Sequence, residues 1–212
     1  MSIFQYQCTI CKKFHDSISE ASSCKENCLK NKDSRNVIDI YKYWKTEAIK
    51  ADLDKKRHNF SVLITNHFHD FNIGAVIRNA NAFLASKVYI LGKKKFDARG
   101  AVGTNHYENL VNIDSMDDLP LGSVIIGFDD VPKAKPIDSY LWNKSQHIIM
   151  CFGQESVGLT ENVLSRCNEV LYIRQYGSVR SLNVGCASAI AMFSYCQQPV
   201  SYTHLTLPTN RE

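Results

Sequence analysis

Two short cysteine pairs near the amino terminus have the spacing of a metal site. Cys8 and Cys11 are separated by two residues, Cys24 and Cys28 by three, and 12 residues lie between the pairs. Two such pairs can converge as a tetrahedral four-thiolate zinc site. Fewer than 30 residues cannot build an apolar core, so the metal would supply the folding energy of this segment. The alternative is four free thiols on an irregular arm, and His15 is a further candidate ligand.

The other four cysteines, which have apolar surroundings, are Cys151, Cys167, Cys186 and Cys196. A free cysteine behaves as a small apolar residue, so we expect these four in the core. The first residues, MSIFQYQCTI, have neither the basic flank nor the apolar run of an export signal. We therefore expect a cytoplasmic protein, where zinc is favoured over disulfides.

The segment GQESVGLT could bind a ligand through its backbone. Gly153 and Gly158 bracket Glu155 in the G-x4-G spacing of a phosphate loop. Leu159 stands where the lysine of such a loop should be, which disfavours an ATPase or a kinase. Glycines still let backbone amides approach a ligand closely. A plain strand-to-helix turn is the alternative.

A second polar segment, RQYGSVRSLNV, places Ser181 and Asn183 before a predicted helix. That helix begins with small residues at 185 and 187–189, which allow another part of the chain to pass very close. Packing of this helix on its own sheet explains the small residues equally well.

A third segment, NHFHDFNIGAVIRNA, places Asn72 at a helix start and Arg78 six residues later among apolar residues. An arginine in such a helix is costly unless it is paired or functional. Arg78 is therefore either a structural ion-pair partner or a site residue.

Short apolar runs alternate with helical patterns and must position these segments. We expect strands at 60–65, 87–91, 123–128, 147–152 and 169–173, and helices at 72–84, 160–166 and 182–197. This alternation predicts an α/β fold in which helices cover both faces of a parallel sheet. Ligands of such folds bind at the carboxyl ends of the strands, where all three polar segments lie.

Length and composition limit the possible classes of protein. The chain has 212 residues and a mass of 24.0 kDa, room for one domain and a small module. With 44% hydrophobic and 22% charged residues, it is neither disordered nor fibrous. The longest run without charged residues, 181–210, is interrupted by polar residues, so we expect no membrane span.

Positive charge is concentrated at the amino terminus. Residues 1–58 carry 12 basic against 8 acidic side chains, and residues 59–212 carry 13 of each. A basic arm on a neutral domain suits phosphate contacts with a polyanion. A solvated helix face is the alternative.

These patterns divide the chain into four parts. We expect a zinc module over 1–34, a basic connecting helix over 35–58, an α/β domain over 59–198 and a tail of uncertain origin over 199–212. The tail follows a proline and has no matching pattern, so it is left out of the fold prediction.

The ordered motifs NxGAxxRxAxAF, FGQExxGLT and GSVxSLNVxxAxAI resemble those of the SpoU (TrmH-like) RNA 2′-O-ribose methyltransferases of the SPOUT superfamily. The resemblance covers roughly residues 59–198. It implies a deep trefoil knot in the C-terminal part of the sheet, an exception to the usual topology. It also implies S-adenosylmethionine as methyl donor, held by backbone around Gly153, Ile173 and Leu182, with Gly158 shaping the loop.

The resemblance also implies roles for side chains. Arg78 matches the arginine regarded as general base on the ribose 2′-OH, and the polar residues that would position it, the substrate or the donor are Asn72, Glu155, Ser181 and Asn183. Because a guanidinium keeps its proton up to about pH 12, orientation of the hydroxyl or phosphate is an equally physical role. The chemistry needs no metal, so the zinc would be structural or RNA-facing.

The partners implied are RNA, with tRNA favoured over rRNA, and a second copy of the chain, because family members complete their sites across a two-fold interface. A non-catalytic RNA-binding protein with the same scaffold is the alternative. Two departures stand out: Ile173-Arg174-Gln175 replaces Ile-Pro-Met, and Phe83-Leu84 replaces Phe-Gly. Arg174 would contact RNA phosphate or lie solvated at the rim.

Overall fold

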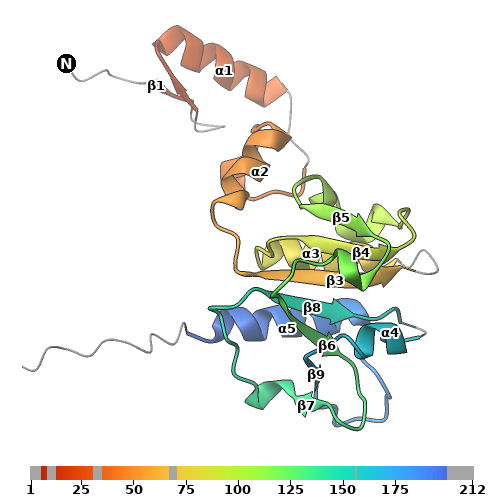
Figure 1. Cartoon of the computed structure of the whole chain (residues 1–212). Helices are drawn as coiled ribbons and strands as arrows, with labels where there is room; N and C mark the ends of the chain where they lie inside the picture. The colour runs from red at the N-terminus through yellow and green to blue at the C-terminus, as the bar shows by residue number, and fades with distance from the viewer. Residues whose placement is uncertain (1–5, 9–12, 31–34, 67–70, 156, 200–212) are drawn as a thin grey trace, which may run out of the picture.

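A sheet of seven parallel strands forms the body of the protein in this computed structural model, which describes residues 6–8, 13–30, 35–66, 71–155 and 157–199 (Figure 1). The strands, in chain order, are β3 (Phe60–Asn66), β4 (Val88–Gly92), β5 (Leu110–Ile113), β6 (Val124–Phe128), β7 (Lys135–Pro136), β8 (Ile148–Phe152) and β9 (Glu169–Tyr172). Their spatial order is β5-β4-β3-β8-β6-β9-β7, and every pairing is parallel. The predicted α/β fold with a parallel sheet is confirmed.

Helical segments connect the strands. The α-helices are α3 (Asn72–Ala82), α4 (Glu161–Leu164) and α5 (Val184–Gln197), and the 3-10 turns are η2 (Ala98–Ala101), η3 (Thr104–His106), η4 (Met116–Asp118) and η5 (Ile137–Ser139). All three helices lie where the helical patterns predict them. The strands β5 and β7 were not predicted, because β5 has only four residues and β7 only two.

Apolar side chains cover both faces of the sheet. Along β3, Val62 and Ile64 face a cluster that includes residues of α3 and α5. Leu63 faces the opposite side, where it joins a second cluster with Met116 of η4 and Val163 of α4. Strand residues alternate between faces, so a continuous apolar run is buried on both sides. The expected covering of both faces is therefore present.

Helices α3 and α5 pack at very short distance. A Cβ atom on Gly185 would lie 3.0 Å from the Cβ of Ala75, and the amide nitrogen of Asn79 donates to the carbonyl of Gly185 at 2.6 Å. The small residues of α5 therefore serve close packing against another segment, as expected from their sequence.

Helix α3 ends in a Schellman motif with an unusual residue. The amide of Ala85 donates to the carbonyl of Ala80 at 2.9 Å, and that of Leu84 to the carbonyl of Asn81 at 3.2 Å. Leu84 has a φ of 53°, in the left-handed region that favours glycine. This is the position where the family pattern has glycine, so the backbone keeps a conformation that leucine adopts at a cost of about 1–2 kcal/mol.

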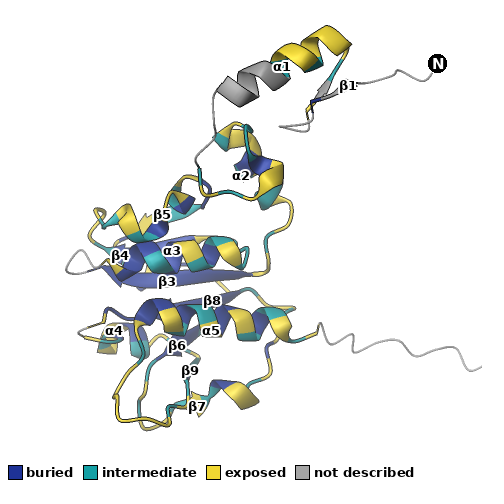
Figure 2. Ribbon diagram, turned by 180° about the vertical axis from the view of Figure 1, so that it is seen from behind, coloured by how far each residue is buried: buried dark blue, intermediate teal, exposed yellow. Residues whose placement is uncertain are grey.

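The amino-terminal segment is a small hairpin followed by a helix. Strands β1 (Tyr6–Gln7) and β2 (Phe14–His15) pair antiparallel, and α1 (Ile18–Lys30) follows, standing apart from the sheet (Figures 1 and 2). Cys8 is almost fully buried, with Cys24 and Tyr43 packed against it. Cys11 and the side chain of Cys28 lie outside the described residues. Within the described part of the chain, no three metal-ligating side chains form a cluster.

The connecting segment is less helical than expected over 35–58. A 3-10 turn, η1 (Asp39–Tyr41), precedes the helix α2 (Thr46–Asp54). Between them Tyr43 has a φ of 69°, which breaks the helix. The break turns the Trp44 ring against Tyr41, with centroids 5.6 Å apart. Packing of these rings outweighs the helical spacing of apolar residues that predicted one helix over 35–58.

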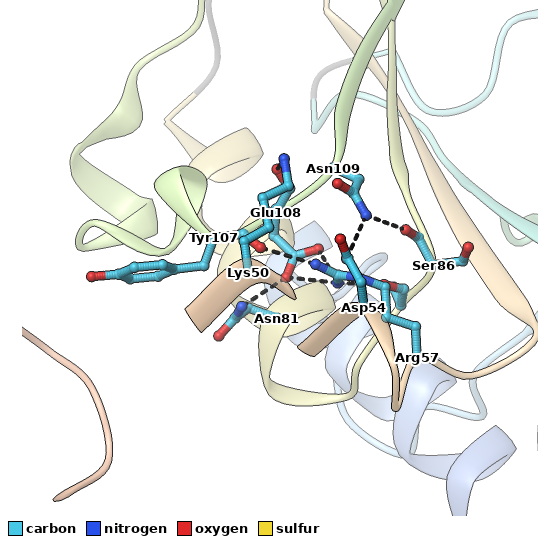
Figure 3. A network of polar contacts seen from close by, with 9 residues as sticks. Lys50, Asp54, Arg57, Asn81, Ser86, Tyr107, Glu108 and Asn109 are labelled. Carbon is cyan, nitrogen blue, oxygen red and sulfur yellow. Dashed lines mark hydrogen bonds and ion pairs between the residues drawn. The ribbon is translucent and has the colours of Figure 1, made fainter. Parts of the chain in front are cut away.

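A buried ion pair joins this segment to the sheet (Figure 3). The guanidinium Nη1 of Arg57 donates to both carboxylate oxygens of Glu108, at 3.0 and 3.2 Å, and Nε donates to Asp54 at 2.6 Å. The Arg57 and Glu108 side chains are 5% and 0% exposed. Burial raises the pKa of Glu108, while Arg57 and a hydrogen bond from Asn81 oppose that rise. Arg57 is therefore structural and cannot contact RNA phosphate.

The four later cysteines differ in burial. Cys151 is fully buried, Cys167 and Cys196 are half-buried, and Cys186 is exposed on α5. The core prediction is thus wrong for Cys186, whose position on the helix points away from the sheet. None of the described helices is both long and apolar enough to cross a membrane.

Candidate active site

A cavity of about 380 Å³ opens at the carboxyl ends of three neighbouring strands. Phe128 of β6 pairs in register with Phe152 of β8 and with Leu171 of β9, and all three line the cavity. The parallel register brings the loops that follow these strands to one edge of the sheet. This is where ligands of open α/β sheets bind.

The loop after β8 forms one wall and leaves no room for a side chain at Gly153. A Cβ atom there would lie 2.0 Å from the carbonyl carbon of Gly158. Gly158 itself has a φ of 67° and donates its amide to the carbonyl of Gln154 at 2.8 Å. Both glycines of GQESVGLT are thus required by the backbone, which can approach a ligand directly.

Asp129 at the end of β6 fastens this loop to the sheet. One carboxylate oxygen accepts the amide of Leu159 at 2.8 Å and would lie 2.7 Å from a Cβ on Gly158. The other accepts the amide of Asp130 at 2.8 Å. Because it fixes the loop and lines the cavity, Asp129 is a positioning residue that the motifs did not indicate.

Three predicted site residues form a hydrogen-bonded ring at the cavity edge. The amide nitrogen of Asn72 donates to Glu155 at 2.7 Å, and that of Asn183 donates to the side-chain oxygen of Asn72 at 2.9 Å and to Glu155 at 3.1 Å. The Asn183 oxygen caps α5 by accepting the amides of Gly185 and Cys186 at 2.9 and 3.4 Å. The ring therefore connects all three motifs.

The segment after β9 forms the opposite wall. Ile173, Ser181 and Leu182 line the cavity, as their predicted roles require. Gln175 lines it too, and its side-chain oxygen is buried without a hydrogen-bond partner in the described structure. A buried acceptor without a donor is costly, so this oxygen fits a ligand that brings an N–H or O–H group.

Arg78 does not join the other predicted site residues. It is exposed on α3 and does not line the cavity, and its side chain makes no hydrogen bond or ion pair with other residues in the described ranges. The ion-pair alternative for Arg78 is thus not observed there. Arg174 pairs with Asp138 at 3.1 Å on the exposed rim.

The order and geometry of these motifs agree with a family comparison. The model of the SpoU rRNA Methylase family matches residues 59–193, more than half of the chain. The chain belongs to the SpoU rRNA methylase family.

Two relatives of this SpoU chain carry names of RNA methyltransferases. The 23S rRNA (guanosine-2'-O-)-methyltransferase RlmB of Acinetobacter baylyi is 36% identical over 66 residues, which are 31% of this chain and 26% of that protein. The tRNA (guanosine(18)-2'-O)-methyltransferase of Saccharomyces cerevisiae is 30% identical over 77 residues, 36% of this chain and 5% of that protein. The chain thus matches only a minor part of either relative.

Solved SpoU structures share the fold. The TrmH/SpoU tRNA modifying enzyme of A. aeolicus gives a TM-score of 0.60 at 16% identity, covering 70% of this chain and 79% of that one. AviRb of Streptomyces viridochromogenes, solved in complex with AdoMet, gives 0.58 at 24% identity, covering 68% and 60%. A structure described by the 2-OH methylation of C/U34 on tRNA gives 0.56 at 25% identity, covering 65% and 95%.

Sequence reasoning missed two residues that line the cavity. Asp129 carried a usable signal, since a polar residue directly after a buried strand lies at the ligand-binding edge. Gln175 was visible as a departure from Ile-Pro-Met, but only the structure shows that its oxygen is buried without a partner.

Proposed function

We propose that this SpoU protein is an S-adenosylmethionine-dependent RNA methyltransferase that modifies a ribose 2′-OH. The observation that carries the proposal is the cavity at the strand ends, bordered by the ring of Asn72, Glu155 and Asn183. The names of both relatives, and AdoMet in the AviRb complex, support it. RNA is the proposed substrate class, with tRNA as the first candidate.

The residues of the cavity fit the methyl donor. Backbone at Gly153, Ile173 and Leu182 would hold its adenosine, and the unpartnered oxygen of Gln175 would accept one of its N–H groups. Asp129 and Glu155 make this cavity partly acidic, which suits a ligand with positive charge. When bound, the donor supplies an electrophilic methyl group on a sulfonium.

The chain's own residues would prepare the nucleophile. A ribose hydroxyl is a weak nucleophile at neutral pH, so its proton must leave as the new bond forms. Arg78 would take this proton as the general base that the resemblance implies, or it would orient the 2′-OH and its neighbouring phosphate with its guanidinium fork while solvent water takes the proton. The donor would leave as its neutral thioether. Glu155, held by Asn72 and Asn183, and Ser181 would position the substrate or the donor. Holding both reactants in line removes an entropic cost of about 7–11 kcal/mol in favourable cases.

A second copy of the chain would complete the site. Arg78 lies outside the cavity of its own chain, so it would serve the cavity of a two-fold-related partner. Exposed apolar side chains one turn apart on α5 support a homodimer interface over α3 and α5: Ile190 is 39% and Phe193 53% exposed. Large apolar side chains gathered on one surface are typical of an interface.

The deep knot and the zinc module belong to the same proposal. In the knot, the segment between β9 and α5 would pass through a loop formed by an earlier part of the chain. This fits the cavity, which is lined by both Gly153 and Leu182. Zinc at Cys8, Cys11, Cys24 and Cys28 fits the burial of Cys8 with Cys24 packed against it. The Nε2 atom of His15 is buried without a hydrogen-bond partner among the described residues, which keeps His15 a candidate ligand.

The domain boundaries stay proposals as well: a zinc module over 1–34, a connecting segment over 35–58, a catalytic domain over 59–198 and a tail over 199–212. The amino-terminal module would bind RNA beside the catalytic domain, and a cytoplasmic location fits RNA substrates.

Methyl transfer by Arg78 variants tests the function. We expect Arg78→Ala to abolish transfer of labelled methyl to RNA, while calorimetry shows unchanged donor binding, because the Arg78 side chain makes no hydrogen bond or ion pair with another described residue. Coexpressing Arg78→Ala with Glu155→Ala should restore activity in mixed dimers, since one of the two sites regains both residues. An active Arg78→Ala enzyme would refute its role, and activity on 2′-deoxy RNA would refute the target hydroxyl. Absence of donor binding would favour the non-catalytic alternative.

A further inference from the structure

Three consecutive lysines follow the carboxyl end of β4. Lys93, Lys94 and Lys95 are all exposed and come directly after Gly92, which is in register with Asn66 at the end of β3. No ion pair involves Lys93 or Lys94 anywhere in the described ranges. Adjacent ammonium groups repel one another, so this loop has unbalanced positive charge.

Asn66 holds the lysine loop in one conformation. Its side-chain nitrogen donates to the carbonyls of Lys93 and Lys95 at 2.6 and 2.8 Å, and its carbonyl accepts the amide of Lys93 at 2.9 Å. Asn66 is fully buried. The backbone that carries the lysines is therefore anchored to the sheet, which lowers the entropic cost of binding a charged partner.

An exposed aromatic ring lies near the same edge. Phe71 directly precedes α3 and is 52% exposed, and the guanidinium of Arg99 lies over its ring at 5.9 Å from the centroid. Asp97 holds Arg99 through two carboxylate contacts at 2.9 and 3.0 Å. A Cβ on Gly100 would lie 2.9 Å from the carbonyl of Phe71, so η2 is packed tightly against this point. The backbone at Phe71 is thereby held against η2, while part of the ring is in solvent.

The loop and the cavity share the carboxyl edge of the sheet. β4 pairs with β3, β3 pairs with β8, and the loop after β8 lines the cavity. Neighbouring strands are about 4.8 Å apart, so the lysines follow a strand that lies about 10 Å from β8. One extended nucleic-acid segment can therefore reach both places.

We propose that Lys93–Lys95 and the Phe71–Arg99 pair form a docking surface for a single-stranded segment of the substrate RNA. The lysines bind phosphates, and Phe71 stacks on a base. The combination of cations and an exposed aromatic ring is typical of surfaces that bind single-stranded nucleic acid. Binding of a polyanion without bases would need only the cations. This inference rests on the proposed function, since RNA is its substrate class.

Neutralising the lysines tests the phosphate contacts. For the Lys93→Gln/Lys94→Gln protein we expect about tenfold weaker binding of a labelled 20-nucleotide RNA at 0.15 M salt, and a salt slope smaller by about 1.4. The matched control is Lys87→Gln, an exposed lysine just before the amino end of the same strand. Equal affinities and slopes for the two variants would overturn the phosphate contacts.

Substitution of Phe71 tests the stacking. Phe71→Leu keeps an apolar side chain but loses the ring, so we expect RNA affinity to fall about fivefold or more, while Phe71→Tyr keeps it. Wild-type affinity for Phe71→Leu would overturn the stacking. A Phe71→Leu protein that no longer dimerises in sedimentation would place Phe71 between copies of the chain and overturn it as well.

Donor binding separates this inference from the proposed function. Calorimetry with S-adenosylmethionine and methyl transfer to bulk tRNA test the function in the wild-type protein, without reference to the loop. The affinities of the lysine and Phe71 variants for labelled RNA test the docking surface, whether or not donor binding and methyl transfer are found. If the wild-type protein binds the donor and every loop variant binds RNA as tightly as the wild type, the docking surface is overturned and the proposed function is not.

Discussion

The side-chain amide of Asn72 donates a hydrogen bond of 2.7 Å to the carboxylate of Glu155, 83 residues further along the chain. Asn183 closes the ring by donating to both of them. Because the three residues lie at the ends of separate elements, they can meet only if α3, β8 and α5 are in place. The ring is therefore a sensitive probe of the candidate site.

Asn183→Ala should lower the free energy of unfolding by about 0.5–2 kcal/mol, since it removes the cap of α5. It should also weaken donor binding, because Glu155 loses a hydrogen bond that orients it. Denaturant unfolding and calorimetry measure the two effects. Asn183→Asp is the control: it keeps the capping oxygen but places a second carboxylate beside Glu155, so stability should be retained better than donor affinity. Unchanged donor affinity in both variants would contradict the positioning role.

Gly153→Ala should damage the cavity, because its Cβ would lie 2.0 Å from the carbonyl carbon of Gly158. We expect a loss of about 1–3 kcal/mol in the free energy of unfolding and loss of measurable donor binding. Gly177→Ala is matched to it, since a Cβ there has no atom within 4 Å from the described residues beyond its two chain neighbours. If both substitutions changed the free energy of unfolding and donor binding equally, the close backbone approach at Gly153 would not be what requires glycine there.

Gln175→Met should have opposite effects on the free and the donor-bound protein. Removing a buried acceptor without a partner should raise the thermal stability of the free protein, and donor affinity should fall about tenfold as one hydrogen bond is lost. Donor analogues that lack either the adenine amino group or the methionine amino group show which N–H is bound. The wild-type protein and Gln175→Met should have equal affinity for the analogue that lacks this N–H group. Tighter donor binding by Gln175→Met would refute the assignment.

Arg57→Met should lower the free energy of unfolding by about 3–5 kcal/mol at pH 7, because it leaves the Glu108 carboxylate buried without its cation. Burial raises the pKa of Glu108 above its ordinary value of 4.5, so the folded state holds this proton more tightly than the unfolded chain. The cost is therefore present above the folded pKa and is relieved as the pH falls toward 4.5.

Urea unfolding between pH 5 and 8 measures this dependence. The control is Arg57→Met/Glu108→Gln, in which the carboxylate is gone and Asp54 still titrates. The stability difference between the two variants should shrink as the pH is lowered. A difference that is constant with pH would show that Glu108 does not carry the effect.

The amino-terminal module should contain one zinc per chain when the protein is purified without chelator. Cys8→Ser and Cys24→Ser should each lose the metal, because both thiols lie at the buried point of the module. Removal of the residues before Arg35 should weaken RNA binding more than donor binding. Metal analysis of the wild-type, Cys8→Ser and Cys24→Ser proteins tests the zinc content. Cys186→Ser, which changes an exposed cysteine outside the module, is the control and should keep the metal.

Local patterns were enough to predict most elements of the fold. β3, β4, β6, β8 and β9 are short apolar runs, and such runs bury themselves as strands whatever lies beyond them. β7 is only two residues, Lys135 and Pro136, and nothing in its sequence indicates a strand. It exists because the edge of β9 offers hydrogen-bonding groups, which is a tertiary effect.

The sequence by itself determined the parallel α/β class, the glycines of the cavity loop and the three polar segments, because turn geometry and apolar periodicity are local properties. Tertiary structure alone decided that Asn183 meets Asn72 across 111 residues, that Arg57 forms a buried ion pair and that Arg78 does not line the cavity. These outcomes depend on strand order and packing between distant segments. No local pattern records which distant residues will become neighbours.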